Sequence, residues 1–240
     1  MVSKAVLRWF RKNRDAEQES RETSKNRPSA SQPQGGALGK HGLTEWFLTT
    51  FTAEEQAYME ERWKPFGGPA NQTLSSGAEG EKASPEAAQF FLVLLADWFS
   101  TKKDSSIGQR ILEKASTYEV DPVALHFQLV AYIKLRYKQR DDDPKAIDDV
   151  IRACEKMISI IPDVVEGMVN EHKANQDAIG KYDPDYEPTP FWGLPPKHAG
   201  FERLIIIRKK QGDKEAAERL QQRYENEWKT LVEALSPDKT

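Results

Sequence analysis

The feature that most constrains the fold of this chain is a helix-start signal that recurs from residue 52 onward. In its commonest form, a serine or aspartate acceptor at the N-cap precedes a proline at the first helical position, where no N–H is needed; this pair occurs at Ser84-Pro85, Asp121-Pro122 and Asp143-Pro144. Thr52 and Glu55 form a capping-box pattern, and Asp104 and Asp213 supply further caps. A chain with this many start signals is expected to consist of successive short helices.

Apolar residues recur at helical spacing after each signal, and no segment shows the alternation typical of a strand. These patterns predict eight helices, over residues 52–64, 85–100, 105–117, 122–139, 144–161, 163–178, 198–211 and 213–235. The connections at 102–104, at 140–143 and at Gly212 are short, so neighbouring helices are expected to run antiparallel. The sequence therefore predicts an all-α fold of antiparallel helix hairpins, stacked because one hairpin cannot bury its own apolar face.

The predicted helices differ in how much of their circumference is apolar. Segments 87–99 and 123–137 are apolar around most of the helix, which is typical of helices surrounded by other helices. Helix 144–161 has a single apolar stripe, and helix 213–235 is more polar still. We therefore expect the first two segments at the centre of the fold, helix 144–161 beside them and helix 213–235 as an outer cover.

One hairpin, 198–224, has the features of a known repeat. Phe201 and Leu204 on its first helix, a turn at Gly212, and a small Ala217 on its second helix follow the order of packing residues, turn and close approach found in tetratricopeptide repeats. Asp213 and Glu215 complete the match. The chain thus resembles the tetratricopeptide-repeat family, and the resemblance implies a right-handed array of stacked hairpins.

The resemblance is weaker elsewhere in the chain. Segment 121–162 has Tyr132 or Tyr137 on its first helix, followed by Ala146, Ala153 and Pro162. The clearer hairpin departs from the family pattern at Ile205, Arg208 and Lys214, and nothing before about residue 84 matches it. An irregular helical bundle unrelated to these repeats is the alternative fold.

The resemblance also implies a function, that of a non-enzymatic scaffold or adaptor that binds a protein or peptide partner. Hairpin 198–224 is expected to cap the array, because a terminal repeat needs a polar outer face. Partner binding is therefore predicted upstream, around Lys134 and Tyr137. Some family members hold a peptide carboxylate with basic side chains on successive first helices. Glu202 and Ile206 accompany Lys210 here, so that set of residues is not predicted.

A second candidate for partner binding is the connection 179–197, which has five prolines and several aromatic residues. Loops of this length within a domain tend either to pack as part of the structure or to be functional. One interpretation is that Phe191 and Trp192 fill a gap between two hairpins. The other is that Tyr186, Phe191 and Trp192 belong to a recognition loop at the binding groove.

The chain is predicted to have three parts. Residues 1–14 form a basic amphipathic segment, in which Arg8 and Arg11 accompany Trp9 and Phe10; 15–42 reads as a disordered linker, and 43–240 as a single helical repeat-like domain. The basic segment fits three alternatives: weak peripheral contact with an anionic membrane, docking on a partner, or no ordered structure.

Composition excludes some partners and compartments. The formal net charge is -3, so no global positive field recruits nucleic acid, and no nucleic-acid partner is predicted. The chain has a single cysteine, Cys154, so an intramolecular disulfide is excluded. We interpret Cys154 as a small core residue. The absence of a disulfide fits a reducing, cytoplasmic location. No apolar run approaches the roughly 20 residues that a membrane helix needs.

No catalytic, cofactor-binding or metal-binding motif occurs in the sequence. The four histidines have no helical partner at metal-ligand spacing; His126 is interpreted as a satisfied core group and His198 as a helix cap. The sequence therefore predicts no enzymatic activity, no cofactor and no metal. A helical sensor of a ligand or peptide, and an enzyme whose acidic site assembles only in the fold, are the alternatives.

Overall fold

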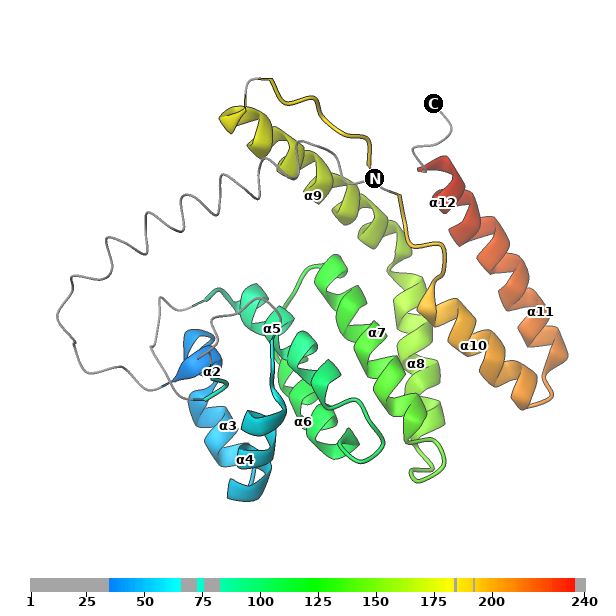
Figure 1. The fold of residues 1–240 in the computed structure, drawn as a ribbon. Coiled ribbons are helices and arrows are strands. Elements are labelled where there is room, and N and C mark those ends of the chain that lie inside the picture. Colours follow the sequence, from blue (N-terminus) through cyan, green and yellow to red (C-terminus); the bar gives the residue numbers. More distant parts are fainter. Residues whose placement is uncertain (1–34, 66–72, 76–82, 184, 192, 236–240) are drawn as a thin grey trace.

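The computed structural model describes residues 35–65, 73–75, 83–183, 185–191 and 193–235. Within these ranges all regular structure is helical and no strand occurs, as predicted. Figure 1 shows the helices following one another across the molecule from the N-terminal to the C-terminal side. They are α2 (Gly36–Lys40), α3 (Thr44–Thr50), α4 (Ala53–Arg62), α5 (Pro85–Trp98), α6 (Ser105–Ala115), α7 (Pro122–Lys138), α8 (Ala146–Ser159), α9 (Ile161–Tyr182), α10 (Ala199–Lys210), α11 (Lys214–Arg223), the π-helix η1 (Tyr224–Lys229) and α12 (Thr230–Ala234).

Three pairs of consecutive helices pack as hairpins: α5 with α6, α7 with α8, and α10 with α11. Helix α7 also contacts both α5 and α6, and α10 contacts both α7 and α8. The first helix of each later hairpin therefore lies against both helices of the hairpin before it. Helix α9 stands outside this order and packs mainly on α7.

The local start signals are largely confirmed. Both hydrogen bonds of the capping box join Thr52 and Glu55, and the side chains of Ser84, Asp121 and Asp213 each accept a backbone N–H in the first turn of their helices. The other two predicted caps are confirmed only in part. Asp104 is the N-cap residue of α6, but its side chain accepts hydrogen bonds from the Tyr58 and Thr101 hydroxyls and none from the first turn. Asp143 accepts hydrogen bonds from Arg136 and the Lys145 N–H, and α8 begins at Ala146, two residues later than predicted.

The apolar interior forms two clusters that share α7. The N-terminal core joins α2 to α7, with fully buried residues such as Phe47, Phe99 and Ile111, and includes Leu135. The C-terminal core joins α7 to η1 and is centred on residues such as Cys154, Phe201 and Trp228. Helix α7 gives Leu135 to the first cluster and Ile133 to the second, which explains why its sequence is apolar around most of its circumference.

The fold begins before the predicted boundary at Leu43, so the predicted linker 15–42 overlaps it. Helix α2 buries Leu38 completely, and the backbone N–H groups of Ala37 and Leu38 donate to the carbonyls of Thr73 and Leu74. A helix of five residues is too short to show a recognisable apolar period in the sequence. It is also too short to be stable alone, so these contacts with residues distant along the chain hold it in place. Residues 1–34 lie outside the described ranges.

Two further elements differ from the sequence prediction. Helix α9 continues to Tyr182 rather than ending at 178, and Figure 1 shows it projecting from the row of hairpins. Its first turns lie so close to α7 that a Cβ on Gly167 would be 2.6 Å from a Val123 methyl. The helix predicted over 213–235 is interrupted by η1. Among the described residues, no helix is both long and apolar enough to cross a membrane.

Candidate functional site

Large hydrophobic side chains that remain exposed are few in the described part of the chain. There are six of them: Leu48, Phe90, Leu94, Phe127, Tyr182 and Ile206. Four of the six lie on α5, α7 and α10, the first helices of the three hairpins, so the exposed apolar surface is concentrated on equivalent elements. Leu48 lies on α3, and Tyr182 at the end of α9.

The exposed residues of α5 and α7 belong to one surface. Phe90, Leu94 and Asp97 follow one another at spacings of four and three residues, which places them on one side of α5. Phe127 and Lys134, two turns apart, share a side of α7. The ion pair between the Lys134 ammonium and the Asp97 carboxylate crosses from one helix to the other and joins these two sides.

Helix α10 extends the same surface. Arg203, Ile206 and Lys210 share one side of this helix, and the Lys210 ammonium donates to the Tyr137 hydroxyl of α7 at 3.1 Å. The hairpin face is defined here as the surface formed by Phe90, Leu94, Asp97, Phe127, Lys134, Arg203, Ile206 and Lys210. It combines exposed aromatic and aliphatic groups with basic side chains.

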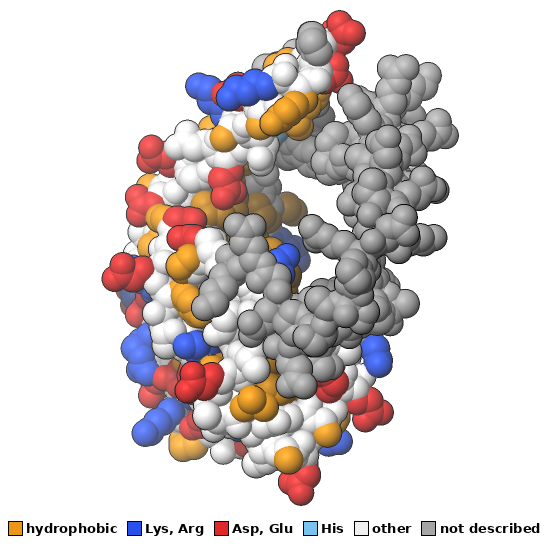
Figure 2. Space-filling model, turned by 90° about the vertical axis from the view of Figure 1, so that its left-hand side faces the viewer, with side chains coloured by type: hydrophobic (Ala, Val, Ile, Leu, Met, Phe, Trp, Pro, Cys, Tyr) orange, Lys and Arg blue, Asp and Glu red, His pale blue; other side chains and the backbone are white. Residues whose placement is uncertain are grey.

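Figure 2 views the molecule from the α2–α4 side. Among the side chains that it colours, hydrophobic groups form several separate patches between charged groups of both signs. On that side the coloured surface has no single continuous apolar area of the kind that marks an extensive interface. The alignment of exposed apolar residues on α5, α7 and α10 is therefore a better indication of a binding surface than the separate patches on the α2–α4 side.

Three cations surround the ring of Tyr137. The Arg203 guanidinium carbon lies 4.0 Å from the ring centroid, that of Arg140 at 4.6 Å, and the Lys210 nitrogen at 5.7 Å. Burial favours the neutral phenol, but the hydrogen bond and charge of Lys210, aided by Arg203, outweigh it and lower the pKa of Tyr137. We name these four residues the Tyr137 cluster.

The structure thus places the two residues predicted on α7 differently. Lys134 is exposed, as a surface role requires, and is held by Asp97. Tyr137 is only 9% exposed, because the cations cover its ring. It contributes to the surface through the side chains that it positions.

The proline-rich connection is attached to its neighbours. The Tyr186 hydroxyl donates to the Gln176 side chain of α9, and Phe191 packs edge-on against His172, with ring centroids 5.6 Å apart. Both aromatic residues are half-buried. Trp192 lies outside the described residues, as do the predicted docking residues Arg8, Trp9, Phe10 and Arg11.

The end of the connection is fixed to the C-terminal core. Leu194 is buried, and the carbonyls of Pro195 and Pro196 accept hydrogen bonds from the Trp228 indole and the Tyr224 hydroxyl, both at 3.0 Å. These contacts explain how two polar aromatic groups are satisfied in η1. They show that this part of the connection packs as structure.

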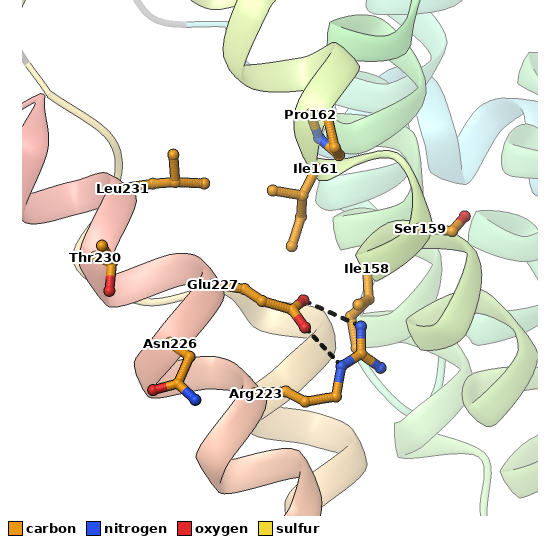
Figure 3. Close-up of a pocket in the computed structure, with 9 residues that line it drawn as sticks. All are labelled: Ile158, Ser159, Ile161, Pro162, Arg223, Asn226, Glu227, Thr230 and Leu231. Carbon is orange, nitrogen blue, oxygen red and sulfur yellow. Dashed lines mark hydrogen bonds and ion pairs between the residues drawn. The ribbon is translucent and has the colours of Figure 1, made fainter.

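An open pocket of about 520 Å³ lies between the α8–α9 junction and the η1–α12 segment. Figure 3 shows Ile161 and Leu231 on its opposite walls and the paired side chains of Arg223 and Glu227 at one end. This ion pair is two-pronged, with N···O distances of 2.8 and 3.0 Å. The remaining lining residues are Ile158, Ser159, Pro162, Asn226 and Thr230.

The pocket offers little for covalent chemistry. The Ser159 hydroxyl donates to the Lys156 carbonyl, and the Thr230 hydroxyl to the Glu225 carbonyl, each within its own helical segment. A hydroxyl nucleophile needs an adjacent base, and no base lines this pocket except Glu227, which Arg223 holds. The pocket is therefore an apolar recess with a neutralised charged end.

Two histidines meet beside the C-terminal core. The rings of His126 and His198 are 5.7 Å apart, and His198 caps α10 by accepting the Phe201 N–H, as predicted. His126 is not the satisfied group that the sequence predicted, since its Nδ1 and the Nε2 of His198 are buried without a hydrogen-bond partner among the described residues. Burial, and next the neighbouring His126, lower the pKa of His198 to about 4.

In the described part of the chain, neither the cysteine nor the acidic residues lie in surroundings typical of a catalytic or metal site. Cys154 is fully buried, and burial raises the pKa of its thiol to about 12, so it is a core residue as predicted and not a thiolate nucleophile. Within the described ranges, no group of three or more histidine, cysteine, aspartate or glutamate residues is arranged to hold a metal ion.

Of the residues that form the hairpin face, the sequence predicts only Lys134 as a partner-binding residue. Phe90, Leu94 and Phe127 lie in segments that are apolar around most of the helix, a pattern that predicts helices enclosed by others. The signal in the sequence is Asp97 of α5, since this charged residue shares a side with Phe90 and Leu94 and indicates that the side is exposed.

No family model matches this chain, and the searches of curated proteins and of solved structures also found no match.

Proposed function

We propose that this chain is a non-enzymatic scaffold or adaptor that binds another polypeptide through the hairpin face. The observation that carries the proposal is the position of Phe90, Leu94, Phe127 and Ile206, exposed on the first helices of three consecutive hairpins. Exposed aromatic and aliphatic groups that align across neighbouring helices mark sites of protein association more often than scattered ones do.

The energetics of these side chains suit binding. Completely burying a Phe, Leu or Ile side chain contributes about 1.5–3 kcal/mol. Phe90 is 51% exposed, Leu94 53% and Phe127 45%, so about half of that gain is still available to a partner at each position. Aromatic anchors of this kind, surrounded by polar residues, are typical of the energetic centres of protein interfaces.

The tetratricopeptide-like, right-handed arrangement is part of the proposal. It is supported by the order of contacts, in which α7 and α10 each lie against both helices of the preceding hairpin. It is also supported by the residues that carry the sequence resemblance: Phe201 and Leu204 are buried, Gly212 has a positive φ of 79°, and Ala217 is 2% exposed. Stacked hairpins of this kind expose their first helices on one common face.

The proposal is tested by comparing captured proteins between surface variants. The full chain and the double variant Phe90→Ser/Phe127→Ser are used as baits, followed by quantitative mass spectrometry. A double variant of α11, Lys214→Gln/Arg219→Gln, is the control. We expect proteins that bind the wild-type and control chains and are depleted at least tenfold on the Phe variant. Equal capture by all three baits contradicts the proposal.

A further inference from the structure

The Tyr137 cluster differs from other charged groups of its neighbourhood in having few acidic partners. Two other charged residues of α10 have partners of opposite charge: Glu202 is 3.4 Å from Lys197, and Arg208 is 3.9 Å from Glu155. Arg203 and Lys210 have no carboxylate within ion-pair distance among the described residues. In the described part of the chain, the one ion pair of the cluster joins Arg140 to Asp141, an exposed side chain 3.5 Å away.

Holding three cations on one ring has an electrostatic cost. Like charges around one ring repel, and the repulsion is larger at a partly buried site than in bulk water. The face of the tyrosine ring attracts cations and offsets part of this repulsion. An added anion near the exposed Lys210 and the partly exposed Arg203 would reduce the repulsion further, because it would interact favourably with both side chains.

The cluster lies at the edge of the apolar part of the hairpin face. Lys210 and Arg203 share a side of α10 with the exposed Ile206, and Tyr137 follows Lys134 on α7. Neighbouring packed helices are about 8–10 Å apart, so a ligand that crosses from α5 to α10 needs only a few extended residues per helix. Such a ligand meets Phe90 and Phe127 first and the cations of the Tyr137 cluster at its other end.

We propose that the partner of the hairpin face is an extended acidic peptide segment, whose side-chain carboxylates bind Arg203 and Lys210 at the Tyr137 cluster while its apolar side chains cover Phe90 and Phe127. This inference rests on the proposed function and specifies its ligand. The chain's own segment 1–14 does not fit the cluster, because it has five basic residues and no acidic one.

The test selects peptides from a phage-displayed library of random twelve-residue sequences on the full-length wild-type chain. We expect the selected peptides to be enriched in Asp and Glu next to aromatic or aliphatic residues. Affinities of one synthetic peptide are then measured by fluorescence anisotropy for the wild type and for Arg203→Gln/Lys210→Gln. The double variant is expected to bind about tenfold more weakly and to lose most of the salt dependence of binding.

Two further variants keep the test independent of folding. The charge-conserving variant Arg203→Lys/Lys210→Arg is expected to retain binding, and Lys214→Gln/Arg219→Gln on α11, which removes the same charge elsewhere, is expected to bind like the wild type. If circular dichroism shows that the Gln variant is unfolded, the charge is tested on the ligand instead. A second synthetic peptide with its Asp and Glu residues replaced by Asn and Gln is then expected to bind the wild type about tenfold more weakly, and equal binding of the two peptides would overturn the acidic ligand.

The outcomes separate this inference from the proposed function. Neutral or basic peptides that lose binding to Phe90→Ser/Phe127→Ser would overturn the acidic ligand and leave the scaffold. Peptides resembling residues 1–14 would instead identify the chain's own segment as the occupant, and a self-association disrupted by Arg203→Gln/Lys210→Gln would identify a second copy. Selected peptides insensitive to every variant of the hairpin face, or no selected peptide at all, contradict both.

Discussion

The buried ionisable groups beside the two cores have different surroundings. Beside the N-terminal core, the buried Asp104 carboxylate accepts hydrogen bonds from Tyr58 and Thr101 and lies 3.7 Å from the Arg62 guanidinium. Beside the C-terminal core, His126 and His198 lie together, and His126 Nδ1 and His198 Nε2 have no hydrogen-bond partner in the described structure. The first arrangement stabilises a charge, whereas the second excludes one, so the two regions should respond to acid over different pH ranges.

The largest expected effect comes from removing a core aromatic side chain. Trp228→Ala deletes a side chain that is 1% exposed in the C-terminal core, and Phe99→Ala makes the matched change in the N-terminal core. Each should lower the free energy of unfolding by about 3–5 kcal/mol, measured by urea denaturation. Because α7 belongs to both cores, we expect one cooperative transition in each variant. Loss of hydrogen-exchange protection confined to the mutated half would show instead that the cores unfold separately.

The next effect concerns Arg136, which is 4% exposed on α7 and binds Asp143 in the turn before α8 and Asp149 in the first turn of α8. Arg136→Ala leaves these carboxylates without their buried partner and should cost about 3 kcal/mol in the free energy of unfolding. Arg152→Ala removes the exposed partner of the same Asp149 and should cost less than about 1 kcal/mol. Equal costs in chemical denaturation would mean that the buried pair has no special structural role.

Acid should weaken the C-terminal region first. Burial lowers the pKa of His198 to about 4, whereas an unfolded histidine titrates near 6.5. The unfolded chain therefore binds the proton first, and the stabilisation present above pH 6.5 is lost progressively as the pH falls toward 4. Between pH 7 and pH 5 the loss should be about 2 kcal/mol, measured by denaturation at each pH.

The control for this pH dependence is His198→Asn, since asparagine also caps a helix but does not titrate. We expect its stability to change less between pH 7 and pH 5 than that of the wild type. An identical slope in both proteins would assign the effect to other groups. Asp104 is the contrasting group in the N-terminal region. Burial acts to raise its pKa, but hydrogen bonds from Thr101 and Tyr58 and the charge of Arg62 outweigh burial and lower it. Its contribution to the free energy of unfolding is therefore present above the ordinary aspartate pKa and is lost as the pH falls below that value.

The smallest effect on stability is expected at the hairpin face. Phe127→Ser changes a side chain that is 45% exposed on the helix shared by both cores, and should lower the free energy of unfolding by about 1 kcal/mol. A change of 2 kcal/mol or more in thermal or urea denaturation would place this residue among those that hold the fold together, and its role in binding would have to be reconsidered.

Helix positions were accessible from the sequence because their signals are local. The caps at Thr52, Ser84, Asp121 and Asp213 each involve atoms within three residues of one another, and the apolar period repeats over a single helix. The side chains of Asp104 and Asp143 differ from the prediction because they bind partners outside the first turn of the helix. Asp104 is held by Tyr58, which lies far from it in sequence, and Asp143 is held by Arg136 across the turn between α7 and α8.

The candidate site was accessible only in part. The sequence predicts Lys134 and Tyr137 as partner-binding residues, and both lie at or next to the hairpin face. Their partners Asp97, Arg203 and Lys210 come from other helices. A single sequence shows which residues share a side of one helix. It does not show which sides of two helices are packed together and which remain exposed, and that distinction separates Leu92, fully buried, from Leu94, 53% exposed on the same helix.

The all-helical class, the start of most helices and their pairing through short turns can be predicted from the sequence, because capping, periodicity and connection length act over a few residues. Four features are visible only in the folded chain: the burial of α2 against residues 73–75, the division of the interior into two cores around α7, the histidine pair with its two unbonded nitrogens, and the gathering of Arg140, Arg203 and Lys210 on Tyr137. These features depend on contacts between segments distant along the chain, whose free energies appear only when the helices are packed together.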